Sequence, residues 1–164
     1  MLYTGTFSKV LFPGIRLAYL VVPANQCALI MKAAQASFSG APVLTQHIVS
    51  NFIAEGHFAR HVQRMHKLYA ERRRLVAQGQ ENVLAKYMQI EQQPGGMHLI
   101  LRLRGRRSDR ALAARLRADG LFVHALSERT VRHAVAPGLL FGFTNIATQA
   151  MAEQLGKRIL AQIR

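Results

Sequence analysis

The sequence has few acidic residues and almost no cysteine. Its 164 residues include 22 Lys and Arg but only 8 Asp and Glu. Cys27 stands alone and cannot form a disulfide within the chain, which is typical of a protein of the reducing cytoplasm. The positive charge, taken alone, would suit nucleic acid, an anionic membrane surface or a phosphorylated ligand, and it does not choose between them.

Long apolar runs are also absent. The longest, residues 17–24, is far shorter than the roughly 20 residues that cross a bilayer, and no charged segment followed by an apolar one opens the chain. We therefore expect no membrane contact. Half of the residues are apolar and 18% are charged, a composition that predicts a globular domain or a piece of a larger one.

The first 22 residues predict a strand, a turn and a second strand. Residues 2–6 and 16–22 are extended, with Pro13 and Gly14 between them. Because the second strand is apolar on both faces, we expect it inside a covered, largely parallel sheet. Two strands cannot form such a sheet alone, and the chain starts directly on a strand, so we expect upstream sequence to be missing.

The remainder predicts a compact α/β unit that follows three helices. The helices are expected at residues 25–38, at 42–55 with Pro42 at its start, and at 57–87 with one apolar face. Strands are expected at 97–103, 121–126 and 139–144. Two further helices are expected at 108–119, capped by Ser108 and stopped by Gly120, and at 147–163. The boundary between the two parts falls along the long helix.

The segment around Lys9 holds the residues of greatest chemical interest. Lys9 follows the first strand, Thr6 and Ser8 lie just before it, and Arg16 lies seven residues after it. A lysine beside a turn is most often a solvated surface residue. The alternative is an amine that forms an imine with an aldehyde cofactor, with the hydroxyls and the arginine binding a phosphate.

This segment resembles the signature of fold-type-I pyridoxal-phosphate aminotransferases. The resemblance implies that Lys9 is the Schiff-base lysine and that Thr6, Ser8 and Arg16 bind the phosphate of pyridoxal 5'-phosphate. Residues 52–61, 64–65, 68–73, 95–99 and 139–143 also look like the MocR family, in which a winged-helix DNA-binding domain is fused to an aminotransferase-like domain.

The resemblance covers nearly the whole chain and implies an α/β fold, the C-terminal portion of a fold-type-I aminotransferase. Residues 1–40 would end the large domain, 41–87 would form connecting and interface helices, and 88–164 would form the small domain. The upstream part would hold the DNA-binding domain, the linker and most of the large domain, including the Asp for the pyridine nitrogen and the aromatic that stacks on the ring.

The function implied is a pyridoxal-phosphate-binding effector domain of a cytoplasmic, homodimeric transcriptional regulator. Its ligand would be a small amino-containing or cofactor-related molecule, and DNA would be bound only through the upstream domain. One alternative is the C-terminal part of an amino-acid aminotransferase, and another is a basic interaction module without cofactor. Leu140 stands where active aminotransferases carry the arginine that binds the substrate carboxylate, which favours sensing. We expect no activity from this piece alone.

Three weaker signals have plainer interpretations. His57 and His61 are spaced like two metal ligands on a helix, but no third ligand is placed by spacing, so no metal site is predicted. The arginines at 72–74, 102, 104, 106 and 107 could contact nucleic acid, yet no aromatics interleave with them. For Cys27 we expect packing rather than catalysis.

Overall fold

The structure, a computed structural model, describes residues 1–37, 40–91, 93, 95–130 and 135–163. The chain divides into two compact units, Met1–Arg64 and Met65–Arg164, and helix α3 (His57–Leu84) contributes to both. No helix within these described ranges is long and apolar enough to cross a membrane.

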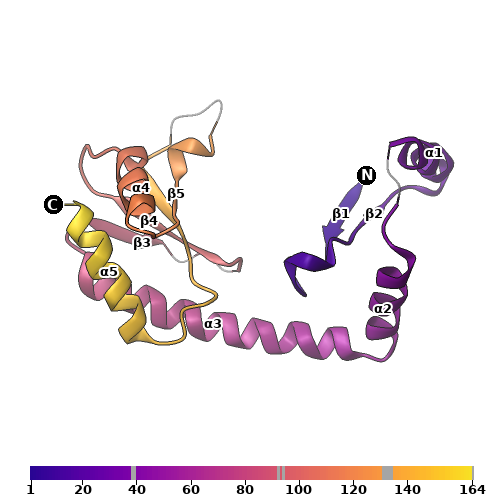
Figure 1. The fold of residues 1–164 in the computed structure, drawn as a ribbon, viewed down its shortest axis with the longest axis horizontal. Helices are drawn as coiled ribbons and strands as arrows, with labels where there is room; N and C mark the ends of the chain where they lie inside the picture. The colour runs from indigo at the N-terminus through magenta and orange to yellow at the C-terminus, as the bar shows by residue number, and fades with distance from the viewer. Residues whose placement is uncertain (38–39, 92, 94, 131–134, 164) are drawn as a thin grey trace. The chain divides into compact units, whose positions relative to one another are not determined.

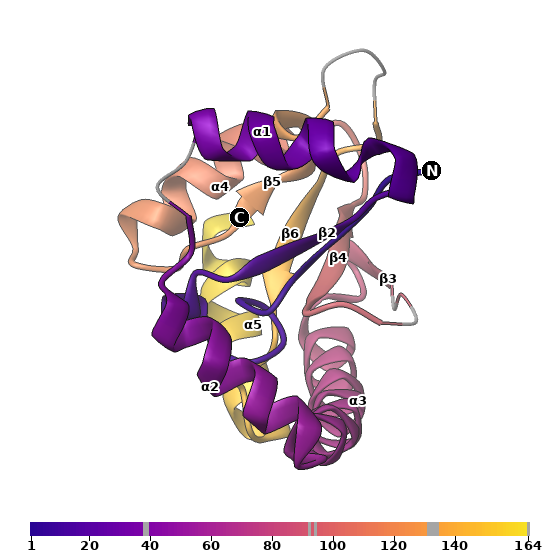
Figure 2. The same cartoon turned by 90° about the vertical axis from the view of Figure 1, so that its right-hand side faces the viewer.

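The first unit combines a hairpin with helices (Figures 1 and 2). Strands β1 (Tyr3–Thr6) and β2 (Ala18–Val21) pair antiparallel, with Thr6 opposite Ala18. The other elements are η1 (Pro13–Ile15), η2 (Ala24–Gln26), α1 (Cys27–Ser37), α2 (Val43–Ala54) and the start of α3. Pro42 is the N-cap residue of α2, as its fixed backbone angle and missing N–H led us to expect near a helix start. The expected end of the first helix, Phe38, lies outside the described residues.

The two expected strands pair with each other as an antiparallel hairpin, and the largely parallel sheet expected around the second strand requires more strands than this two-stranded sheet has. Parallel neighbours need a long crossover connection, usually a helix. Only a turn and the short η1 helix separate these two strands, so they fold back on each other as a hairpin. The apolar run in β2 therefore correctly indicated a strand, and its place in a larger, largely parallel sheet stays a prediction. Side chains of both strands are largely exposed within this chain.

The second unit is a four-stranded antiparallel sheet with helices on one face. The strand order is β3-β4-β6-β5. The elements are β3 (Met88–Glu91), β4 (His98–Leu103), α4 (Asp109–Ala118), β5 (His124–Ala125), η3 (Leu126–Glu128), β6 (Gly138–Gly142) and α5 (Gln149–Ile163). β3 is not among the strands expected from the sequence, which assigned residues 88–91 to neither a helix nor a strand.

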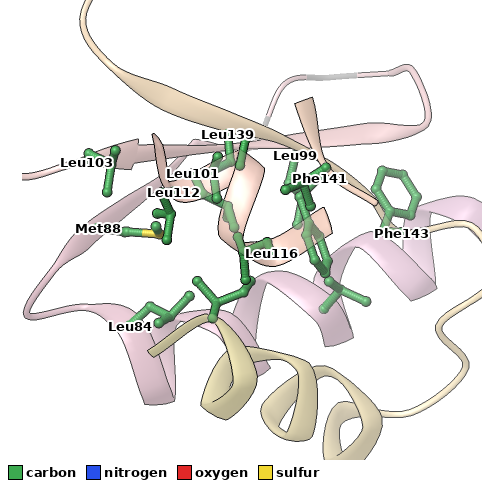
Figure 3. Close-up of a cluster of buried hydrophobic side chains, with 14 of the residues drawn as sticks. Leu84, Met88, Leu99, Leu101, Leu103, Leu112, Leu116, Leu139, Phe141 and Phe143 are labelled. Carbon is green, nitrogen blue, oxygen red and sulfur yellow. The ribbon is translucent and has the colours of Figure 1, made fainter. Parts of the chain in front are cut away.

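Alternate residues of the central strands build the core. Leu99, Leu101 and Leu103 of β4 are buried, as are Leu139 and Phe141 of β6. Figure 3 shows these side chains gathered with others from β3, α3 and α4. The intervening residues, among them Leu140 and Ile100, which are register partners, point to the opposite face of the sheet and are only partly buried.

Helices α3 and α5 cross at closely packed glycines. A Cβ atom on Gly79 would lie 2.7 Å from Cβ of Ala152 and 3.0 Å from the carbonyl oxygen of Gln149. Gln80, fully buried beside this crossing, donates from Nε2 to the carbonyl oxygen of Ala152 at 2.9 Å. Small residues thus allow the two backbones to approach closely, and one buried amide fixes their register.

Asp109 connects three parts of the second unit. Ser108 caps α4 as expected, with its hydroxyl accepting from the N–H of Ala111 at 3.3 Å. The neighbouring Asp109 carboxylate is 3% exposed. It accepts from the N–H and the hydroxyl of Ser127 at 3.0 and 2.6 Å, and from the N–H of Gly138 at 3.1 Å. The start of α4 is therefore tied to η3 and to the first residue of β6.

Candidate functional site

The four residues singled out around Lys9 lie together at one end of the β1–β2 hairpin. Thr6 ends β1, and Ser8 and Lys9 follow in the turn after it. The N–H of Phe7 donates to the carbonyl oxygen of Leu17 at 3.0 Å, which extends the pairing by one step beyond Thr6 and Ala18. Arg16 directly precedes Leu17, so the pairing of Phe7 with Leu17 brings Arg16 toward Ser8.

The turn that carries Lys9 is closed by hydrogen bonds to one carbonyl. The oxygen of Phe7 accepts from the N–H of Leu11 at 2.8 Å and from that of Val10 at 3.2 Å. On its other side, Oγ1 of Thr6 accepts from the N–H of Ser8 at 3.2 Å. The backbone on both sides of Lys9 is therefore fixed, while the Lys9 side chain is exposed.

Arg16 has an uncommon backbone conformation. It follows η1 with φ 48° and ψ 34°, the left-handed region, and it is the one non-glycine residue of the described segments with a positive φ. This conformation costs an L-residue about 1 kcal/mol. It sharply reverses the chain after Pro13 and Gly14 and presents the exposed Arg16 at the end of the hairpin.

A chain of aromatic contacts packs the hairpin against α3. The Tyr19 ring covers Gly5, where a Cβ atom would lie 2.4 Å from the ring. Tyr19 also contacts Phe7, with ring centroids 5.5 Å apart, and Phe7 meets Phe58 of α3 edge to face at 5.9 Å. A side chain at position 5 would have to displace the Tyr19 ring, and the cluster connects the Lys9 turn to the first turn of α3.

The two histidines considered as metal ligands both contact the Phe52 ring but have separate polar partners. Nδ1 of His57 accepts from Nη2 of Arg60 at 2.9 Å, and its Nε2 is 3.2 Å from the Glu55 carboxylate. His61 instead reaches the hairpin, where its Nε2 is 2.9 Å from the carbonyl oxygen of Val10. The sequence did not indicate this last contact, because it joins residues 51 positions apart.

Two cavities share the side chains of Phe52 and His61, and the first of them also borders the segment after Lys9. The first, about 260 Å³, is apolar, and the second, about 330 Å³, is basic. The apolar cavity is lined by Leu11, Phe12, Ile15, Ile48, Val49, Phe52 and His61. The basic cavity is lined by Phe52, His57, Arg60, His61 and Arg64.

Several arginines of the expected basic patches are used in internal contacts. Arg72 donates to the carbonyl oxygen of Thr144 and Arg73 to that of Gly96. The guanidinium of Arg73 also lies 5.3 Å from the centre of the Phe143 ring. Arg102 donates to Glu91 at 2.9 Å and to the carbonyl oxygen of Ala136 at 2.7 Å. Cys27, near the start of α1, is directed at the carbonyl oxygen of Pro23.

The chain is similar in structure to aminotransferases of fold type I. The α-aminoadipate aminotransferase of Thermus thermophilus, solved with N-(5'-phosphopyridoxyl)-L-leucine, matches 99% of this chain with a TM-score of 0.84 and 21% identity. This chain covers 42% of that one. The fold is therefore the C-terminal portion of a fold-type-I pyridoxal-phosphate aminotransferase, as the sequence predicts.

A family model narrows this class. Residues 1–148 match the model for aminotransferase class I and II, and the chain belongs to that family. Pyridoxal phosphate is the cofactor of the family, which confirms the cofactor expected from the Lys9 segment.

The curated relatives include regulators and an enzyme. Over 93% of its own length, this chain is 29% identical to the probable rhizopine catabolism regulatory protein MocR of Rhizobium meliloti. Over 85% of its own length, it is 32% identical to the pyridoxine biosynthesis regulator PdxR of Corynebacterium glutamicum. It is 29% identical to the 2-aminoadipate transaminase of Thermus thermophilus over 84%. These matches cover 31%, 30% and 32% of the respective proteins. The resemblance to MocR-type regulators is thereby confirmed.

The residues of the hairpin end fit the cofactor of this family. Residues 1–64 contain five Lys and Arg, which are Lys9, Lys32, Arg16, Arg60 and Arg64, and one acidic residue, Glu55. Glu55 is close to His57. A phosphate dianion needs this balance of charge together with hydroxyl and N–H donors. Hydroxyls, an exposed guanidinium and a primary amine are all present at one end of the hairpin.

Proposed function

We propose that this chain is the pyridoxal-phosphate-binding effector part of a MocR-type transcriptional regulator, with DNA bound by a winged-helix domain elsewhere in the protein. Its similarity to two regulators over most of its length carries the proposal. The Lys9 turn supports it, because the amine, the hydroxyls and the guanidinium lie in one short hairpin.

In this proposal Lys9 supplies the primary amine that holds the cofactor covalently. Thr6, Ser8 and Arg16 bind the phosphate, Arg16 through a guanidinium that can donate two parallel hydrogen bonds. When bound, pyridoxal phosphate supplies an aldehyde that combines with amines and a ring that accepts electrons. A ligand with its own amine competes with that of Lys9. Binding of such a ligand changes the conformation of the protein only to the extent that the ligand binds one of two protein conformations more tightly than the other.

The same proposal assigns parts and partners. Residues 1–40 end the large domain, 41–87 form connecting and interface helices, and 88–164 form the small domain. The protein is a cytoplasmic homodimer whose ligand is a small amine or a molecule related to the cofactor. The exposed apolar residues of the hairpin and of α2, such as Leu20, Val21 and Leu44, are consistent with further protein covering the first unit.

A second candidate is the C-terminal part of an amino-acid aminotransferase. The similarity to 2-aminoadipate transaminase favours it. Leu140 weighs against it, because its side chain cannot bind a substrate carboxylate by charge and lies beside apolar Ile100 on the sheet. An assay for amino-group transfer to a 2-oxo acid separates the two candidates, since the regulator is expected to transfer none at a useful rate.

An absorbance titration of the purified full-length protein with pyridoxal phosphate tests the role of Lys9. We expect the near-visible band of lysine-bound cofactor in the wild type and in Lys32→Ala, an exposed lysine of α1, but none in Lys9→Ala. A band that persists unchanged in Lys9→Ala would refute the assignment.

A DNA-binding assay tests the regulator. DNA fragments from the neighbourhood of the protein's own gene should be bound, and pyridoxal phosphate should alter the affinity in the wild type. Lys9→Ala should bind DNA without responding to the cofactor. Absence of DNA binding together with amino-group transfer would favour the enzyme instead.

A further inference from the structure

His61 joins helix α3 to the peptide group that directly follows Lys9. Its Nε2 lies 2.9 Å from the carbonyl oxygen of Val10. A carbonyl oxygen can only accept, so Nε2 carries the proton and donates. The side chain of His61 is half-buried, and the ring of Phe52 meets it edge to face with centroids 6.5 Å apart. The imidazole is therefore held in place by packing as well as by its hydrogen bond.

The same face of α3 contacts the turn on the other side of Lys9. Phe58 precedes His61 by three residues, a spacing that places both side chains on one helix face. Its ring packs against that of Phe7 at 5.9 Å and an angle of 75°. The carbonyl oxygen of Phe7 in turn accepts the N–H groups of Val10 and Leu11. One helix face thus contacts the residues two before and one after Lys9.

We propose that His61 is a positioning residue for the cofactor lysine. This inference depends on the proposed role of Lys9. The Lys9 side chain is long, exposed and free to rotate, and forming a covalent bond to a cofactor requires its amine to be placed repeatedly at one point. Fixing the peptide on either side of the residue reduces the freedom that is lost on bond formation, which is preorganisation.

The proposal predicts an effect that depends on the chemistry of the ligand. Pyridoxal phosphate engages both the phosphate-binding groups and the amine of Lys9. Pyridoxamine phosphate has the same ring and phosphate but no aldehyde, so it cannot bond covalently to Lys9. A residue that positions Lys9 should therefore matter for the first ligand and little for the second. A residue needed only for folding should affect both alike.

The experiment measures the affinity of the purified full-length protein for both ligands, by absorbance for pyridoxal phosphate and by calorimetry for pyridoxamine phosphate. We expect His61→Ala to weaken pyridoxal phosphate binding about five- to tenfold, the range for loss of one hydrogen bond. Pyridoxamine phosphate binding should change less than about twofold. His61→Gln, whose amide nitrogen can take the place of Nε2, should restore most of the loss.

Control variants make each outcome decisive. Gln63→Ala replaces an exposed polar residue two positions later on α3, and it should leave both affinities unchanged. His61→Asn, whose shorter amide does not reach the position of Nε2, should behave like His61→Ala and serves if the alanine variant does not fold.

Equal weakening of both ligands, or full affinity in His61→Ala, overturns the positioning role. If Lys9→Ala itself keeps the near-visible band, the proposed function fails first. The Lys9 and His61 results therefore distinguish failure of the cofactor assignment from failure of this inference.

Discussion

Replacement of Asp109 by alanine should destabilise the second unit far more than a typical substitution at a helix start. The carboxylate is buried and accepts three hydrogen bonds from Ser127 and Gly138. Alanine leaves the N–H groups of both residues without this acceptor. Asp109 also lies in the first turn of α4, where a negative charge interacts favourably with the helix dipole.

The expected loss is about 3–4 kcal/mol of unfolding free energy. Each buried donor left without a partner costs about 1–3 kcal/mol, and the helix-dipole interaction adds about 0.3–1 kcal/mol. Ser127→Ala removes the hydroxyl that donates to Asp109 at 2.6 Å and accepts from Nε of Arg110 at 3.1 Å, so it should cost about 1–2 kcal/mol. Asp119→Asn weakens an exposed ion pair with Arg158 and should cost less than about 1 kcal/mol.

Urea unfolding of the three variants, combined with hydrogen exchange of the Ser127 and Gly138 amides, measures the effect. The amides should lose protection in Asp109→Ala and keep it in Asp119→Asn. A double variant of Asp109 and Ser127 should cost less than the sum of the single changes, because the two side chains share one contact. If Asp109→Ala is no less stable than Asp119→Asn, the proposed junction of α4, η3 and β6 is wrong.

Three further predictions concern pH, packing and ligand choice. Burial raises the pKa of Asp109, but hydrogen bonds from Ser127, Gly138 and Arg110 outweigh it and hold that pKa below its usual value. The stabilisation by the ionised carboxylate is therefore present above about pH 4 and is lost as the pH falls through the lowered pKa. The difference in thermal stability between wild type and Asp109→Asn should thus narrow in acid, and a difference that widens would contradict this. Gly79→Ala forces its new Cβ against Ala152 and should cost about 1–3 kcal/mol, whereas exposed Gln78→Ala should change thermal stability by less than about 0.5 kcal/mol. Leu140→Arg should increase the affinity of the cofactor-loaded protein for α-amino acids by at least about tenfold if a carboxylate is bound at this face, measured by spectral titration with Leu140→Met as the control.

The sequence was sufficient for most helices because their boundaries depend on local chemistry. Pro42 and Ser108 mark helix starts through effects within a few residues of themselves. Strand β3 was missed because its four residues directly follow a long helix and have too little length for a period to emerge. The strand is defined by pairing with β4, where Met88 lies opposite Leu103, and such long-range pairing is not visible in local pattern.

The candidate site was predicted in part for a similar reason. Thr6, Ser8, Lys9 and Arg16 are close in the sequence, so their spacing could be read directly, and their assignment to the cofactor stays a prediction. The contact of His61 with Val10 could not be predicted, since it depends on how α3 packs against the hairpin. In the sequence, the one sign of this contact was that His61 is a polar residue three positions after Phe58 and therefore lies on the same helix face.

The positive charge of the second unit also has a structural use. Arg115 of α4 donates from Nε and Nη2 to the carbonyl oxygen of Gln162, at 3.2 and 2.8 Å, near the end of α5. Arg158 of α5 donates to the backbone oxygen and the carboxylate of Asp119, at the end of α4. The last carbonyl groups of a helix lack partners within it and carry partial negative charge. Each helix thus caps the other, so part of the positive charge of the second unit serves to fix these two helices.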